Sequence, residues 1–165
     1  MVKLKPAQVT DLQLAELRIT ELVAKVGPNP DRAGGVIALA VEGKVLATKG
    51  ADIAVAELQL KVRGSPKDSK GKQDFAFSVD VKAISEIKWD TKAFVMPDFT
   101  SAEVNDGLFQ LMYPVLVLHV KQASAAMGFG LLKIESNFVA HAARQRLKEG
   151  NVVKRAGGKP KLAKG

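Results

Sequence analysis

Hydrophobic and polar residues alternate over 75–82, which is the clearest structural pattern in the chain. A period of two is typical of an antiparallel strand with one buried and one solvated face. A second strand is predicted at 53–62, where the alternation changes phase once. The segment 64–72 between them is polar and contains glycine, proline and serine, so the two strands should form a hairpin.

Two further strands are predicted nearer the N-terminus. Residues 36–46 form one candidate. Residues 12–26 fit neither a period of two nor one of 3.6 cleanly, so a long bent strand and a helix both remain open. We favour a strand with a bulge near Ala15–Glu16, because two alternating halves are out of phase there. The loop 27–35, with two prolines and three glycines, separates the candidates.

The pattern becomes helical after residue 100. Thr100 or Ser101 can serve as N-cap, and Glu103 stands at capping-box spacing from Thr100. Pro114 should kink this long helix, because proline lacks the N–H that an interior position donates. The face predicted to meet the sheet consists of Leu108, Leu111, Met112, Val115, Leu118 and Gln122.

The sequence Gly128-Phe129-Gly130 should end the long helix. A short extended piece at 131–134 and a second helix at 138–148 are predicted to follow, the latter facing inward through Phe138, Ala142 and Leu147. The predicted fold is therefore α+β: a four-stranded antiparallel sheet covered by a long helix and a shorter C-terminal helix. We expect one domain over 1–148 and a basic, disordered tail over 149–165.

This order of elements resembles that of the SecB export chaperones and their SecB-like relatives. Leu111-Met112-Tyr113-Pro114 resembles the Leu-Phe-Pro-Tyr-like segment of that family's long helix. Gly128-Phe129-Gly130 is similar to the Gly-Phe-Pro-like turn that ends it, with the proline missing, and Asn137-Phe138 to the Asn-Phe that opens the last helix. The resemblance runs in order from about Leu14 to Leu147. It implies an ATP-independent holdase that forms tetramers as dimers of dimers.

The net charge of this chain differs from that of the SecB family. SecB proteins are characteristically acidic and use that charge to meet the export motor SecA, whereas this chain has a net charge of +8. Residues 144–165 carry eight bases and one acid, which leaves 17 bases against 16 acids in residues 1–143. The tail is expected to act as a solubilising segment or to contact an acidic partner or nucleic acid. A relative adapted to a toxin–antitoxin system or a phage fits these departures better than an export chaperone.

Other compositional features set limits on location and chemistry. The chain has no cysteine, which suits a reducing cytoplasm, and its N-terminus lacks the apolar core of a signal peptide. We expect a cytoplasmic protein that does not insert into membranes. His119 is expected to be a packed or interface residue, and His119 and His141, without a nearby carboxylate pattern, make a poor metal site. No metal site, cofactor or catalytic residue is predicted, so the chain should not be an enzyme.

Candidate binding residues are aromatic or flexible side chains near the sheet. The predicted client-binding residues are Trp89, Phe94, Met96, Phe99, Phe75 and Phe77. Exposed aromatics can hold unfolded polypeptides without sequence specificity, but the four residues between 89 and 99 could instead seal one end of the core. The predicted oligomer interface consists of Leu17, Ile19, Val117 and Val120, on the first strand and the long helix.

Three functions follow from these observations. The first is a holdase that binds non-native polypeptides through an apolar groove and works as a dimer or tetramer. The second is an interaction or inhibitor protein with one specific protein partner. The third is a nucleic-acid binder that uses its basic tail.

Overall fold

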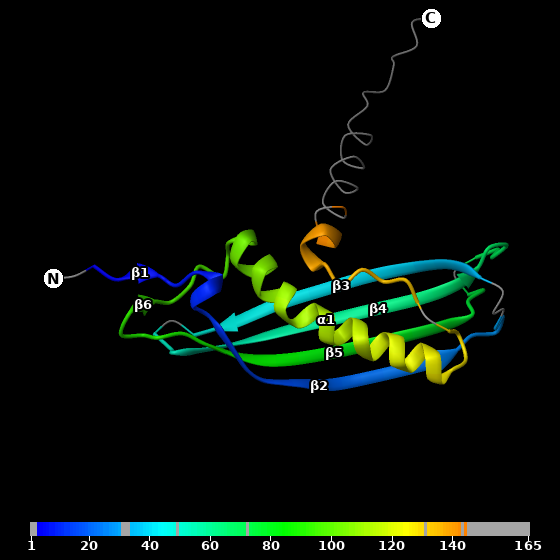
Figure 1. The fold of residues 1–165 in the computed structure, drawn as a ribbon, viewed down its shortest axis with the longest axis horizontal. Helices are drawn as coiled ribbons and strands as arrows, with labels where there is room; N and C mark the ends of the chain where they lie inside the picture. Colours follow the sequence, from blue (N-terminus) through cyan, green and yellow to red (C-terminus); the bar gives the residue numbers. More distant parts are fainter. Residues whose placement is uncertain are drawn as a thin grey trace, which may run out of the picture.

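Four long strands form one antiparallel sheet in the computed structural model, which describes residues 3–30, 34–48, 50–71, 73–130, 132–142 and 144 (Figure 1). The strands are β2 (Gln13–Val26), β3 (Gly35–Ala47), β4 (Ile53–Pro66) and β5 (Phe77–Lys88). Their spatial order is β2-β5-β4-β3, which places β2 and β3 at opposite edges. The connection after β2 therefore crosses from one edge of the sheet to the other.

The predicted hairpin is confirmed by the pairing of β4 with β5. Its register runs from Ile53 opposite Lys88 to Gly64 opposite Phe77. Both strands are longer than predicted, because β4 continues to Pro66 and β5 continues to Lys88. The glycine, serine and proline at the end of β4 extend the ladder, although their residue types are typical of a turn.

The bulge predicted in the first strand is also confirmed. The pairing of β2 with β5 shifts register between Ala15 and Arg18 and again between Ile19 and Glu21. Glu16 has a φ of 52°, a left-handed conformation that reverses the phase of the side chains that follow. This change of phase explains why the sequence over β2 fits no single period.

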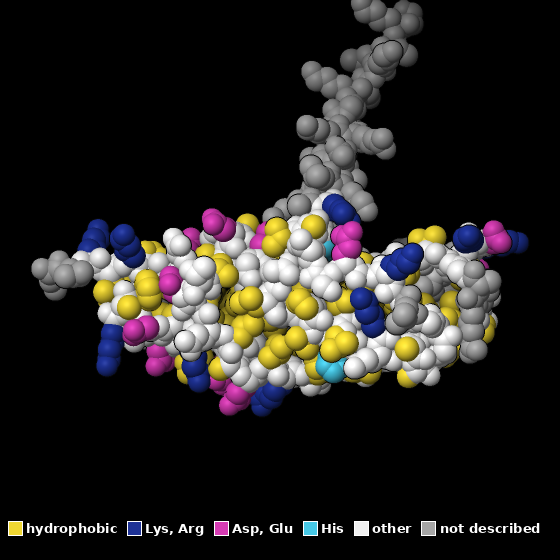
Figure 2. All heavy atoms as spheres, viewed as in Figure 1, with side chains coloured by type: hydrophobic (Ala, Val, Ile, Leu, Met, Phe, Trp, Pro, Cys, Tyr) yellow, Lys and Arg dark blue, Asp and Glu magenta, His cyan; other side chains and the backbone are white. Residues whose placement is uncertain are grey.

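One face of the sheet is covered by the long helix α1 (Ala102–Ala126), and burial in β4 and β5 alternates accordingly. Leu58, Leu60 and Val62 on β4 and Val79 and Val81 on β5 are buried toward the helix. On the outer surface over α1, hydrophobic side chains gather near the middle, whereas most charged side chains lie at the ends and along the upper and lower rims in that view (Figure 2). The core is one layer of apolar side chains between α1 and the sheet.

The helix face predicted from the sequence is partly wrong. Leu108 and Met112 are buried, but Leu111 is 47% exposed and Leu118 is 53% exposed. The buried side chains of α1 are Leu108, Phe109, Met112, Tyr113, Leu116, Val117, Val120 and Ser124. Two apolar stripes run along this helix, and the stripe with the aromatic rings of Phe109 and Tyr113 faces the sheet. Larger rings bury more apolar area, which favours that orientation.

The start of α1 differs from the predicted capping box. Ser101 is the N-cap and makes no side-chain hydrogen bond to the helix. The hydroxyl group of Thr100 instead donates a hydrogen bond to Oδ1 of Asp98, at 2.5 Å. The helix continues through Pro114 as a single element.

The end of α1 follows the glycine pattern. Gly128 and Gly130 have φ values of 84° and 62°, in the left-handed region that favours glycine. The described residues of 132–136 contain no strand, so the extended piece is an irregular return segment. A second helix is described at 138–142 and 144, with Phe138 and Ala142 buried as predicted. Leu131, residues 145–148 and the tail at 149–165 lie outside the described residues.

Two short strands were missed by the sequence prediction. β1 (Lys5–Pro6) and β6 (Phe94–Val95) pair in parallel, with Lys5 opposite Phe94. Together with the short 3-10 helix η1 (Val9–Asp11), they occupy one end of the sheet (Figure 1). Strands of two residues carry too little periodic signal for prediction.

Candidate functional site

A cavity of about 500 Å³ opens beside the start of β3, at the end of the sheet opposite β1 and β6. Val36 and Ile37 of β3 line one side. Phe129 of the glycine turn after α1 and Leu132 of the return segment line the other. Phe77, at the start of β5, contributes to the same lining. We call this cavity the β3 groove.

The β3 groove is shaped by a stack of aromatic rings on a glycine. The ring of Phe77 packs on the ring of Phe129, with centroids 4.8 Å apart. A Cβ atom on Gly64 would lie 2.2 Å from the Phe77 ring, so only glycine at this position of β4 lets the ring lie on the strand. The ring of Phe129 therefore rests on Phe77, which in turn rests on Gly64 of the sheet.

The return segment that forms the other wall is fastened to α1. Nε2 of Gln110 donates a hydrogen bond to the carbonyl oxygen of Ser136 at 3.1 Å, and Oε1 of Gln110 accepts one from the backbone N–H of Val139 at 3.2 Å. Oδ1 of Asn137 accepts a hydrogen bond from the N–H of Ala140 at 3.0 Å, which caps the second helix. One glutamine side chain thus holds both ends of the turn that leads into this helix.

The strand edge next to the groove carries no protection against pairing. Among the described strands, β3 pairs with β4 alone, over 13 residues without a register shift. The first part of β3, residues 35–41, has no charged side chain, and Val36 is 63% exposed. An edge of this kind offers backbone donors and acceptors to another extended chain.

The structure separates the six predicted client-binding residues between the two ends of the sheet. Phe77 lines the β3 groove but is buried beneath Phe129. Phe75 is close to this end, where Cζ of Arg63 lies 4.5 Å from the centroid of its ring. The other four residues follow the far end of β5 and do not meet the groove.

Of those four residues, Trp89 belongs to the core. It is 7% exposed, and its ring meets the edge of Phe99 at a centroid distance of 6.0 Å. Phe94 lines a different cavity, of about 670 Å³, beside the N-terminal segment, and Met96 is 38% exposed. Trp89 therefore seals one end of the core, which is the alternative role considered for the residues between 89 and 99.

The predicted oligomer residues are also placed differently from expectation. Val117 and Val120 are buried against the sheet within the chain, so neither offers surface to a second copy. Leu17 and Ile19 on β2 are half-buried. The exposed apolar side chains of α1 are instead Leu111 and Leu118.

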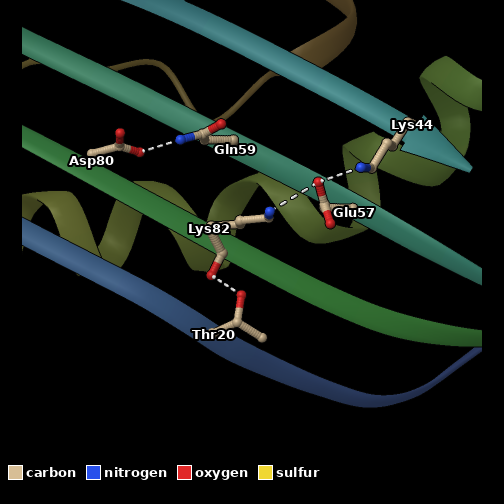
Figure 3. Close-up of polar contacts among 6 residues, drawn as sticks. All are labelled: Thr20, Lys44, Glu57, Gln59, Asp80 and Lys82. Carbon is tan, nitrogen blue, oxygen red and sulfur yellow. Dashed lines mark hydrogen bonds and ion pairs between the residues drawn. The ribbon is translucent and has the colours of Figure 1, made fainter.

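The middle of the sheet face away from α1 is polar, and a chain of ion pairs crosses it (Figure 3). Oε1 of Glu57 on β4 lies 3.1 Å from Nζ of Lys44 on β3 and 3.1 Å from Nζ of Lys82 on β5. Burial alone would raise the pKa of Glu57, but the two ammonium groups outweigh it and hold the pKa below its ordinary value. These contacts tie β3, β4 and β5 together.

The same open face mixes acids with bases. Nε2 of Gln59 donates a hydrogen bond to Oδ1 of Asp80 at 2.8 Å, and Lys61 pairs with Glu42 at 3.4 Å (Figure 3 shows the first of these). The described strands thus present no uniformly basic face for a nucleic acid.

Within the described part of the chain, no group of three or more His, Cys, Asp or Glu side chains is placed to hold a metal ion. No described helix is both long enough and apolar enough to cross a membrane.

The residues lining the β3 groove that the sequence did not identify are Val36, Ile37, Phe129 and Leu132. The Gly-Phe-Gly pattern located the turn that contains Phe129, but not the ring's position above Phe77. The groove residues come from segments that only the order of the strands brings together.

Comparison with known proteins identifies the fold. No family model and no curated protein matches the sequence. Among solved structures, the chain is similar to a SecB-like chaperone of Mycobacterium tuberculosis, solved in complex with a ChAD peptide from an antitoxin, with a TM-score of 0.58 and 17% identity. The match covers 76% of this chain and 90% of that chain. The chain therefore has a SecB-like fold, as the motif resemblance implied.

Proposed function

We propose that this protein is a SecB-like, ATP-independent holdase that binds extended segments of non-native polypeptides in the β3 groove. The observation that carries the proposal is the apolar cavity beside an unprotected strand edge. A non-native chain exposes apolar side chains and unpaired backbone groups, and this site offers a counterpart for each. We place this activity in the cytoplasm, without a cofactor.

Binding would begin with backbone pairing along residues 35–41. Alternate side chains of the added segment would point to the face that carries α1, where Ile37, Phe129 and Leu132 can receive them. The remaining side chains would point to the opposite face of the sheet. Backbone hydrogen bonds do not depend on side-chain identity, so one site could serve many clients.

A double substitution in the groove tests this function. Phe129→Ser with Leu132→Ser should abolish suppression of aggregation of an unfolded test protein, because it removes two half-buried apolar walls of the groove. The matched control, Phe94→Ser with Met96→Ser at the other end of the sheet, should retain most of the activity. Circular dichroism must show that both variants are folded. Full activity in the groove variant, or loss only in the control, would contradict the proposal.

A single specific partner is the second candidate function. The structural neighbour was solved with a peptide from an antitoxin, so a SecB-like fold can hold one defined partner segment. If this chain does the same, a pull-down from lysate should recover one protein rather than many. Both functions would use the β3 groove, and the number of recovered proteins separates them.

We further propose that the protein forms a dimer or tetramer through the outward stripe of α1. Leu111 and Leu118 are about half exposed and lie seven residues apart, on the same side of the helix, with the half-buried Val115 between them. Leu111→Glu with Leu118→Glu should yield a monomer in light scattering, whereas Val95→Glu with Met96→Glu, at exposed positions outside α1, should leave the assembly intact. A wild-type monomer at micromolar concentration would contradict this assembly.

A further inference from the structure

Both charged side chains among the described residues of the β3 groove are basic. Lys67 follows the end of β4 and Lys133 belongs to the return segment, and both line the cavity. No acidic residue is among the described residues of this lining. Both lysines are exposed, and neither forms an ion pair with another described residue.

The cavity at the other end of the sheet has the opposite charge. Asp11, Asp98 and Glu103 line it, and Lys5 is its one described base. Residues 1–143 together carry nearly balanced charge. The basic rim is therefore a local property of the β3 groove and does not simply reflect the composition of the folded part.

The two lysines stand on opposite walls of the groove. Lys67 is on the side of the sheet, just beyond Pro66, the pairing partner of Gly35 at the start of β3. Lys133 follows Leu132 on the return segment. A segment added along residues 35–41 would therefore have one of its ends between two ammonium groups.

We propose that the β3 groove selects extended apolar segments that are flanked by acidic residues. This inference rests on the proposed function and names the chemistry of its substrate. A carboxylate beside the apolar stretch would pair with Lys67 or Lys133, whereas a lysine or arginine there would be repelled. Apolar contacts and backbone pairing supply the affinity, and the rim lysines supply the preference.

Two matched peptides test the preference on the full-length protein. Both are capped and share one alternating core of phenylalanine, valine and serine; one carries two glutamates at each end and the other two lysines. The acidic peptide should bind about two- to tenfold more tightly in fluorescence anisotropy, the range expected for one or two exposed ion pairs. The difference should disappear in about 1 M salt, where charges are screened within about 3 Å.

Reversing the charge of the two rim lysines provides a second test of the preference. Lys67→Glu with Lys133→Glu should invert the preference, so that the lysine-flanked peptide binds more tightly. The matched control is Lys3→Glu with Lys92→Glu, which changes the net charge equally at exposed positions away from the groove. The control should keep the preference for the acidic peptide.

The outcomes distinguish this inference from the function on which it rests. Equal binding of the two peptides, or a preference that the control variant inverts as strongly as the rim variant, overturns the proposed selectivity and leaves the holdase function intact. Failure of both peptides to bind overturns the holdase function as well. Inversion in the rim variant alone supports the acidic-flank preference.

Discussion

The two edge strands of the sheet, β2 and β3, expose opposite kinds of surface. β2 contains two register shifts and carries Glu16, Arg18, Glu21 and Lys25 along its length. β3 is regular over 13 residues, and residues 35–41 are uncharged. Charges and bulges are the usual means by which proteins prevent pairing at a sheet edge. β2 has both along its length, whereas β3 has no bulge and carries charges only at Glu42 and Lys44, outside residues 35–41.

The difference indicates where a second chain would be added. The sequence predicts the first strand, β2, as an edge for association, because an edge strand left open is a pairing site. The edge that we propose for client binding is instead the uncharged stretch 35–41 of β3, which lies beside the cavity lined by Phe77, Phe129 and Leu132.

The largest expected effect concerns the packing of α1 on β3. Phe109 of α1 packs over β3 so closely that a Cβ on Gly43 would lie 2.6 Å from its ring, and it also contacts Phe138. Phe109→Ala should lower the free energy of unfolding by about 3–5 kcal/mol in urea, the usual cost of truncating a buried aromatic residue. Leu111→Ala, on the exposed stripe, should cost less than about 1 kcal/mol. Equal costs would mean that the burial of the two stripes is assigned wrongly.

A smaller effect should appear in the backbone when a client binds. Hydrogen exchange of residues 35–41 should slow by about tenfold or more with a saturating client peptide, because outward N–H groups of β3 become hydrogen-bonded. Residues 13–26 of β2 should be unchanged and act as the internal reference. Protection confined to β2, or to the connection 89–99, would place the binding site elsewhere.

The smallest expected effect concerns the ion pairs on the open face. The pKa of Glu57 is lowered in the folded protein, so its stabilisation is present above the pKa of the unfolded chain, about 4.3, and is lost as pH falls through the folded value. Glu57→Gln should therefore cost up to about 1 kcal/mol at pH 7 and nothing near pH 2.

Glu42→Gln is the matched control for that prediction. Glu42 is more exposed and has one lysine partner, Lys61, at 3.4 Å. Its substitution should change the unfolding free energy by less than a few tenths of a kcal/mol. A pH-independent cost at Glu57 would show that the charge of this side chain does not tie β3 to β5.

The sequence predicted those features that depend on neighbours in the chain. Alternation identified the β4–β5 hairpin, the change of phase at Ala15–Glu16 identified the bulge, and Gly128 and Gly130 marked the end of α1. Each of these features is set by local backbone preference or by the period of burial, which one sequence contains.

Features that required contacts between distant segments were predicted less well. Two apolar stripes on α1 have similar composition, and only packing of Phe109 on Gly43 and of Tyr113 on Phe138 shows which one faces inward. Likewise, the aromatics at 89–99 were grouped by closeness in sequence, although the sheet places them at the end opposite the β3 groove.

The sequence by itself determined the SecB-like order of strands and helices, the bulge in β2 and the glycine turn after α1. The tertiary structure alone decided which edge is left unprotected, which face of α1 is exposed and which residues form the groove. The physical reason is that side-chain periodicity reports whether a residue is buried, but not which partner buries it. That partner depends on the order β2-β5-β4-β3, which brings residues 34–37, 64–65, 76–77 and 132–133 together from four separate parts of the chain.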